Sequence, residues 1–420
     1  MAWLALAGCR GASCAAPREE VTITPAPDPP KRIETVALTL EGAHVTSLVA
    51  TGKNDLLVGG WFFRQARIGD HTVHGDPADE LGHVFLARVV DGQVQWARVF
   101  PAMSVALARS SDGIPWAVLT YERPIVLGPH RYVPRGRATE DYDWKGPLDL
   151  LLWRVDATGE PVAAVALASQ RVDPWPLAGL SLSPEGSPVV LAMFDVPVPP
   201  IHTGKHLSVI ASFAKDSARH VRSIELPEVE RPTRLSIDGS GNLVVAGQMG
   251  ERYWERKTVL LRISPEGGRL AQTDLGDDDV FALACRPDGR GVAVVGPPRG
   301  IGGELLRPGE TRLLEVAIDG HITESRSLDP AVHITELAVQ PSGDVVLFGT
   351  KIEAADDRRA WLEIRGVNGE RRWSRSSAER SEAQALAMES EDTIWIAVRE
   401  GSRPISFAQR KVTLRRIGAE

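Results

Sequence analysis

The residue types that most often perform chemistry are present in this sequence, but they do not form a catalytic or metal-binding pattern. Ten histidines and three cysteines occur among 420 residues. The pairs His71/His74 and His202/His206 have spacings that approximate metal-ligand pairs, yet neither has a third ligand nearby, and no cysteine pair has zinc-site spacing. We therefore interpret both histidine pairs as solvated loop residues and predict no metal site and no disulfide framework.

Two polar segments and one absent motif also bear on whether the chain has an active site. The residues at 277–279 are three consecutive aspartates, which lack the alternating oxygen spacing of a calcium loop. The segment 298–303 is glycine-rich, but no Lys-Ser/Thr pair or helix follows it, so it does not predict a phosphate cradle. No Gly-x-Ser-x-Gly nucleophile elbow occurs. We predict no catalytic residues and no cofactor, and hence a protein that is not an enzyme.

One long connection between apolar strands contains residue types that are common at binding surfaces. Arginine, tyrosine and tryptophan are enriched at binding hot spots, and function on a rigid scaffold concentrates in loops. The segment 121–147 carries a candidate binding face made of His130, Arg131, Tyr132, Arg135, Arg137, Tyr142 and Trp144. The alternative is an insertion whose aromatic side chains pack on their own sheet.

Composition indicates an ordinary globular protein and excludes two classes. Hydrophobic residues make up 43% and charged residues 25% of the chain, which is enough apolar material for a core. A net charge of −7 argues against electrostatic binding to nucleic acid. No apolar run reaches the roughly 18 residues of a membrane-spanning helix. We expect a monomer, in which Cys285, within an apolar strand-like run, is a buried small side chain.

A short turn followed by an apolar strand recurs along the chain. The turns lie at 53–55, 111–113, 184–186, 240–242, 287–289, 341–344 and 390–392. A second apolar strand follows each, at 84–90, 148–156, 207–215, 258–264, 312–318, 360–367 and 411–418. Turn residues between β-branched runs are the signature of hairpins, so the sequence contains seven copies of one hairpin-based unit.

The repeat predicts a propeller. Each unit accommodates four short strands in about 50 to 70 residues, as expected of a propeller blade. The last unit lacks its fourth strand, whereas the chain contains an orphan strand at 33–40 before the first unit. We therefore predict an all-β fold: a single seven-bladed β-propeller with four-stranded blades over residues 32–420, closed by the N-terminal strand in a 6+1 arrangement.

Two parts of the repeat are similar to known families. The stretch 82–96, together with Gly59, Gly60, Trp61 and Phe62, resembles the SBBP-type β-propeller repeats of myxobacterial cell-envelope proteins. That resemblance implies a propeller without catalytic residues. The stretch 156–159 (Asp-Ala-Thr-Gly) resembles a quinoprotein repeat, whose relatives include a propeller lipoprotein of outer-membrane protein assembly.

The N-terminal segment resembles that of a bacterial lipoprotein. Leu6-Ala7-Gly8-Cys9 is similar to the lipobox, in which the cysteine is lipidated. We interpret residues 1–9 as a truncated signal segment, because the apolar stretch is short and no positive region precedes it. Residues 10–31 are rich in proline and predict an extended tether. The resemblance implies a lipid anchor on Cys9 and a location in the cell envelope, at the outer membrane. The alternative is that the motif is a chance match within an apolar leader.

Together these features predict a non-enzymatic cell-envelope lipoprotein that binds an unknown protein or glycan through long loops on one face. Two alternatives stay open. One is a propeller enzyme, a hydrolase or lyase, with its site at the channel mouth; the other is a component of outer-membrane protein assembly.

Overall fold

A computed structural model describes most of the chain. The described residues are 32–76, 82–110, 112–134, 149–167, 177–194, 207–250, 257–298, 310–354, 357–401 and 410–419. The predicted signal segment with Cys9, the tether at 10–31, and the loop residues Arg135, Arg137, Tyr142 and Trp144 lie outside them. All regular secondary structure in the described ranges is β-strand.

Five separate four-stranded sheets form most of the fold. The first contains β6 (Ala102–Arg109), β7 (Pro115–Tyr121), β10 (Asp149–Val155) and β11 (Pro161–Leu167). The second contains β12 (Leu177–Leu182), β13 (Pro188–Phe194), β14 (Leu207–Phe213) and β15 (His220–Leu226). The third contains β16 (Arg231–Ile237), β17 (Leu243–Met249), β18 (Lys257–Ile263) and β19 (Arg269–Gly276). The fourth contains β20 (Asp279–Cys285), β21 (Gly291–Gly296), β22 (Arg312–Val316) and β23 (Ile322–Ser327). The fifth contains β24 (Val332–Val339), β25 (Val345–Ala354), β26 (Asp357–Arg365) and β27 (Arg371–Ser376).

The remaining strands form one eight-stranded sheet and one small hairpin. The large sheet contains β28 (Ser381–Met388), β29 (Ile394–Glu400), β30 (Lys411–Ala419), β1 (Arg32–Gly52), β2 (Asp55–Ile68), β4 (His83–Val90) and β5 (Gln93–Phe100), with β3 (His71–His74) paired to β2. The hairpin contains β8 (Ile125–Leu127) and β9 (His130–Tyr132).

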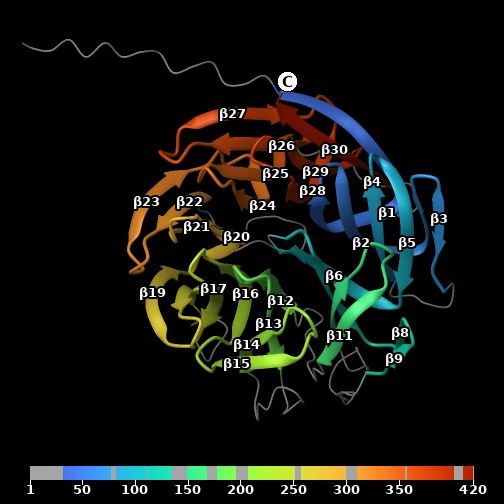
Figure 1. Ribbon diagram of the computed structural model, residues 1–420. Coiled ribbons are helices and arrows are strands. Elements are labelled where there is room, and N and C mark those ends of the chain that lie inside the picture. The colour runs from blue at the N-terminus through green and yellow to red at the C-terminus, as the bar shows by residue number, and fades with distance from the viewer. Residues whose placement is uncertain are drawn as a thin grey trace, which may run out of the picture.

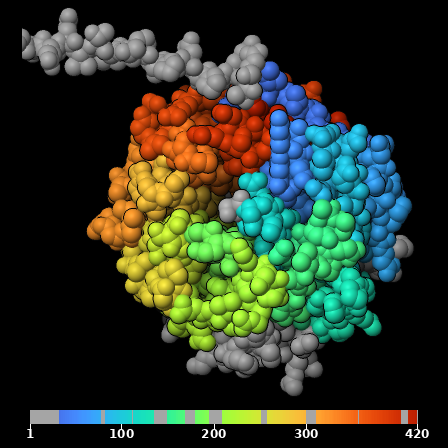
Figure 2. Space-filling model, viewed as in Figure 1, coloured from blue at the N-terminus to red at the C-terminus, as the bar shows by residue number. Residues whose placement is uncertain are grey.

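The sheets are arranged around a common centre, as in a β-propeller. Figure 1 shows β6, β12, β16, β20, β24 and β28 nearest the centre, and β5, β11, β15, β19, β23 and β27 at the rim. Figure 2 shows the same view as a rounded surface on which the sheets follow one another in chain order. The predicted all-β propeller with four-stranded blades is confirmed at this level.

The predicted number of separate blades is wrong: the structure contains five four-stranded sheets and an eight-stranded one, not seven four-stranded sheets. The reason is that β1 is a single strand of 21 residues. Its first half, to Glu41, pairs with β30, and β2 pairs with its second half, from Ala43, and with Leu40 and Glu41. Gly42 lies between them with a φ of 70°, which a residue without Cβ adopts without strain. The chain thus turns without breaking the strand, so two expected sheets are continuous.

The innermost strands follow one another around the centre. β1 contacts β6, β6 contacts β12, and the series continues through β16, β20, β24 and β28, which contacts β1. Apolar side chains fill the spaces between neighbouring sheets: Trp116 and Trp153 are both buried, on opposite faces of the sheet that contains β7 and β10. The scaffold is therefore a series of sheets packed face to face, and their inner edges surround the axis.

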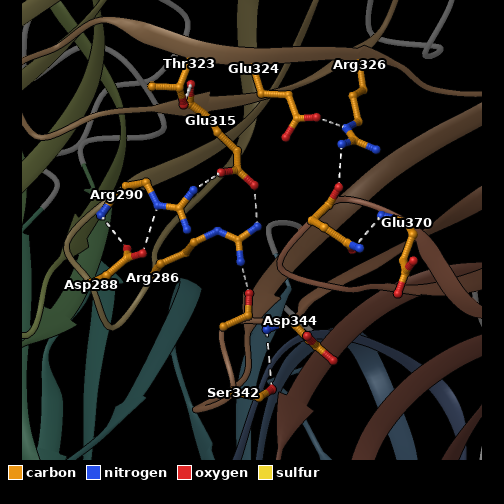
Figure 3. Close-up of polar contacts among 12 residues, drawn as sticks. Arg286, Asp288, Arg290, Glu315, Thr323, Glu324, Arg326, Ser342, Asp344 and Glu370 are labelled. Carbon is orange, nitrogen blue, oxygen red and sulfur yellow. Dashed lines mark hydrogen bonds and ion pairs between the residues drawn. The ribbon is translucent and has the colours of Figure 1, made fainter. Parts of the chain in front are cut away.

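Buried arginines join successive sheets at the end where the short turns lie. Arg286, only 1% exposed, donates hydrogen bonds to the Glu315 carboxylate and to the backbone oxygen of Gly343 in the next sheet. The other Glu315 oxygen accepts a 2.7 Å hydrogen bond from Arg290 (Figure 3). A buried charge is tolerated only when it is paired and hydrogen-bonded. This network is therefore a structural connection between two sheets.

Candidate functional site

A β-bulge lies near the start of six of the innermost strands and in the second half of the seventh, β1, and these bulges mark one end of the central axis. The register shifts place the extra residues at Thr46, Met103, Ala178, Thr233, Phe281, Thr335 and Gln384. An innermost strand starts at the end where the long connections between second and third strands also lie, because the strands alternate in direction. Bulges redirect side chains and are common at the rims of barrels and next to active sites. We call this end of the axis the mouth.

Arg234 follows a bulge and reaches across the mouth to the neighbouring sheet. Its Nε and one Nη donate to the backbone oxygen of Phe281 at 3.1 and 2.8 Å, and the other Nη donates to that of Thr233 at 2.7 Å. The side chain is exposed, yet desolvation lowers the pKa of its guanidinium, against the raising charges of Glu336 and Asp279. Arg234 forms no ion pair with any carboxylate of the described ranges.

Glu336 occupies the matching position after the bulge of β24. Its Oε2 accepts a 2.7 Å hydrogen bond from the backbone N–H of Leu386 on β28. Burial raises the pKa of Glu336 to about 8, although the Leu386 N–H and the charge of Arg234 oppose the shift. At pH 7 the carboxyl group is therefore mainly neutral, and it can donate a hydrogen bond.

An aromatic group lies at the same end of the large sheet. His44 on β1 and its register partner Trp61 on β2 are stacked, with ring centroids 5.7 Å apart and an interplanar angle of 26°. Phe63 packs edge-on against Trp61 at 5.3 Å and is 38% exposed. The three rings form a surface that is partly open to solvent.

The charges of two guanidinium groups act on the imidazole of this aromatic group. Burial, followed by the charges of Arg410 and Arg399, lowers the pKa of His44 to about 4, so its imidazole is neutral at pH 7. Arg399 forms an ion pair with Glu382, which also accepts a 3.2 Å hydrogen bond from Arg358. The mouth thus combines aromatic faces, a neutral imidazole and several cationic side chains.

The candidate binding face predicted from the sequence is described only in part. His130 and Arg131 on β9 are exposed. Tyr132 is half-buried and packs against the core between two sheets, and burial raises the pKa of its hydroxyl. His130 and Tyr132 are in contact, with centroids 6.3 Å apart. Whether this face binds a partner stays a prediction.

The sequence analysis missed Arg234, Glu336, His44 and Trp61 as members of one end of the molecule. They come from strands far apart in the chain: His44, Arg234 and Glu336 each lie within two residues of a bulge, and Trp61 is the register partner of His44. One signal was present: Arg234 and Glu336 are charged residues within first strands that are otherwise mainly apolar or small.

The remaining chemical groups of the sequence have other surroundings. His71 and His74 are exposed on β3, and Asp278 pairs with Arg312 at 2.8 Å. No group of three His, Cys, Asp or Glu side chains in the described part of the chain is arranged to hold a metal ion. Burial raises the pKa of the half-buried Cys285 thiol to about 11. The described residues contain no helix long and apolar enough to cross a membrane.

A cavity of about 260 Å³ lies at the opposite, short-turn end, between the large sheet and its neighbour. Its polar lining is already engaged: Arg88 forms a double hydrogen bond with Asp55, at 3.0 and 2.7 Å. Arg88 and Trp96 both donate to the backbone oxygen of Ala157 at 2.8 Å. Because these groups join the two sheets, we place the candidate site at the mouth instead.

Comparisons with known proteins identify the fold of this chain but do not assign it to a family. No protein-family model and no curated protein matches the sequence. Among solved structures, hydrazine synthase from Kuenenia stuttgartiensis has a TM-score of 0.52 at 11% identity, over 87% of this chain and 97% of that one. An ulvan lyase, a polysaccharide lyase, has a TM-score of 0.52 at 9% identity, over 93% and 96%. Its complex with -[GlcA(1-4)Rha3S]- has a TM-score of 0.50 at 9% identity, over 90% and 95%.

At such identities these likenesses show a shared fold alone. No sequence-family match supports the resemblance to SBBP-type repeats. The structure shows a β-propeller.

Proposed function

We propose that this protein is a non-enzymatic binding scaffold that holds an acidic glycan at the mouth of a seven-bladed propeller. The observation that carries the proposal is the stacked pair His44 and Trp61, on whose imidazole the charges of Arg399 and Arg410 act.

The seven-bladed geometry rests on three regularities. Seven innermost strands follow one another around the axis, and each has a bulge, which lies near the start of the strand in six of them and in the second half of β1. The two ends of the described chain are paired through β1 and β30. In this proposal the eight-stranded sheet is two blades that share β1, and the pairing of β1 with β30 closes the ring.

The ligand chemistry follows from the groups at the mouth. Aromatic rings with an apolar face and a polar edge suit the stacking of sugar rings. Guanidinium groups suit carboxylate or sulfate groups, which they bind in a bidentate fashion. The whole protein has a net charge of −7, so attraction of an acidic polymer depends on this local group and not on overall charge.

A glycan fits these groups better than a protein partner does. Protein interfaces have an apolar centre, whereas the residues of the mouth are mainly charged, polar or aromatic. The ulvan lyase structure, which has the same fold, holds a glucuronate-containing ligand. This is an analogy and not evidence about the ligand of this chain.

Catalysis is the second candidate, and one observation favours it. His44 is neutral at pH 7 and is therefore able to accept a proton, while Glu336 is mainly protonated and able to donate one. A lyase or hydrolase acting on an acidic glycan would use such groups. Release of short or unsaturated products from the bound polymer would replace the scaffold proposal with this one.

The binding proposal is tested by calorimetry with alginate, an acidic polysaccharide, and dextran, a neutral one. We expect alginate to bind and dextran not to bind, and Trp61→Ala to weaken binding at least tenfold. Arg269→Gln is the matched control, because Arg269 is a surface arginine on an outer strand paired with Glu228. Equal binding of both polymers, or equal affinity of the two variants, would contradict the proposal.

We also propose that the scaffold is a monomer that is anchored in the cell envelope, at the outer membrane, by a lipid on Cys9. The lipobox-like motif Leu6-Ala7-Gly8-Cys9 is the only support for the anchor. Fractionation of cells tests it: the wild type should sediment with membranes, and Cys9→Ser should be released. An unchanged distribution of Cys9→Ser would contradict the anchor.

A further inference from the structure

We propose that the cavity of about 260 Å³ at the short-turn end, between the large sheet and the first sheet, binds a small uncharged aromatic molecule. The inference goes beyond the proposed function, because the cavity lies at the end of the axis opposite the mouth. It gives the scaffold a second site, and the ligand of that site is apolar instead of acidic.

The cavity exists because two arginines in matching places reach different turns. Arg88 on β4 and Arg262 on β18 each lie on the strand that pairs with the outermost strand of its sheet. Arg262 donates to the backbone oxygen of Gly289, in the turn between the first two strands of the next sheet. Arg88 donates instead to Ala157, in the turn between the last two strands of the next sheet. The space beside the first of these turns is therefore left open in the interface that contains Arg88.

Other interfaces between sheets are filled more completely. The cavity that Arg262 lines, between the third and fourth sheets, has a volume of about 10 Å³. The cavity that Trp361 lines, between the fifth sheet and the large sheet, has a volume of about 20 Å³. Spaces larger than a water molecule are few in a packed protein interior, and binding sites are commonly preformed cavities with mainly apolar walls. The larger cavity is thus a feature of one interface and not of the way these sheets pack in general.

Apolar side chains supply much of the cavity wall. The lining includes five aliphatic residues and one indole: Leu57, Ile114, Pro115, Val155, Val162 and Trp96. An apolar cavity of about 150 Å³ is large enough to hold benzene, so this cavity has room for an aromatic ring. The Trp96 N–H already donates to the Ala157 oxygen at 2.8 Å, which fixes the indole as a ring against which another ring can pack.

The charged groups of the lining are already hydrogen-bonded to the protein. Asp55 and Arg88 pair with each other. Oδ1 of Asp156 accepts two backbone N–H groups of its own turn at 2.7 and 2.8 Å, and Asp112 accepts a hydroxyl of its own turn. Arg154 donates to a backbone oxygen of the second sheet at 3.1 Å. A charged ligand would compete with these contacts or lose its hydration without a partner, whereas an uncharged ring displaces only water.

The cavity can be reached from solvent. Val162, the second residue of β11, is 50% exposed, and Asp112 and Ala157 are also exposed. A small molecule can therefore enter without separation of the two sheets.

The test is an NMR titration of the full chain with indole as the uncharged probe, and with benzoate and benzylamine as charged aromatic controls. The reporter is the side-chain N–H signal of Trp96, assigned by its absence in Trp96→Phe. We expect indole to shift this signal and to bind at least tenfold more tightly than either ion. An unshifted Trp96 signal, or equal affinities for the three molecules, would overturn the proposal.

A second measurement places the ligand inside the cavity. Val162→Trp puts a large side chain at the opening and should weaken indole binding at least tenfold. Val221→Trp is the matched control, because Val221 is the second residue of β15 and is 60% exposed. The other tryptophan signals of each variant show that it has folded. Indole binding that is unchanged in Val162→Trp, or equally weakened in Val221→Trp, would overturn the proposed site.

Discussion

The backbone N–H of Leu386 donates a 2.7 Å hydrogen bond to the Glu336 carboxyl group, which joins two neighbouring innermost strands. The acceptor is a half-buried acid that reaches from β24 to β28 beside the bulge of each strand. The contact fixes the position of Glu336 and links the protonation state of the mouth to the packing of the scaffold.

Glu336 should make the folded state less stable as the pH rises. Burial raises the pKa of Glu336 from 4.5 to about 8, so the native state holds a proton that the unfolded state loses above pH 4.5. The stabilisation that this group contributes is therefore complete below pH 4.5. It decreases between pH 4.5 and pH 8, by no more than about 1.4 kcal/mol per pH unit. Urea denaturation from pH 5 to 9 should show this decline in the wild type and less of it in Glu336→Gln. Parallel curves for the two proteins would contradict the prediction.

Removing one member of the buried network at Arg286 should strongly destabilise the protein. Arg286→Ala leaves the Glu315 carboxylate and the Gly343 oxygen without their buried donor. Loss of one partner of a buried ion pair costs about 3–5 kcal/mol. Arg290→Gln is the control, because its side chain is 31% exposed, and we expect a smaller loss. Urea denaturation measures both, and equal effects would show that burial does not set the strength of this connection.

The first half of β1 should be required for stability of the whole ring. Leu40 is completely buried in the core that also contains Val412 and Leu414 of β30. Leu40→Ala should cost about 2–5 kcal/mol. Val36, on the same strand, is 62% exposed, so Val36→Ala should cost less than about 0.5 kcal/mol. Similar thermal midpoints for the two variants would contradict closure through β1.

The thiol of Cys285 should be unreactive in the folded protein. Burial raises its pKa to about 11, and the thiolate is the reactive form. In a Cys9→Ser/Cys14→Ser background, labelling by a maleimide at pH 8 should be at least tenfold slower than in urea. Labelling at equal rates in both conditions would show that the site is open.

Much of the fold was predictable because its signals are local. Turns such as Asn54–Asp55 between apolar runs identify the hairpins, and the second strands lie where the sequence placed them. The orphan strand at 33–40 is paired with β30. The count of separate sheets was not predictable, because Gly42 reads as an ordinary turn residue and the sequence does not reveal that β1 continues through it.

The candidate site was predictable to a much smaller extent. A bulge leaves no clear sequence signature, so the position of Arg234 and Glu336 directly after the bulges of β16 and β24 could not be predicted from the sequence. The sequence emphasised Arg131 and Tyr132 because of their residue types, whereas tertiary packing turns Tyr132 toward the core.

Hydrogen exchange with and without an alginate oligosaccharide tests the central claim most directly, since it reports which end of the propeller the ligand covers. We predict slower exchange in peptides that contain the starts of the innermost strands, at 43–47, 231–236 and 332–337, and in the peptide around Trp61. Slower exchange confined to β8 and β9 or to the short turns, or no change anywhere, would contradict a binding site at the mouth.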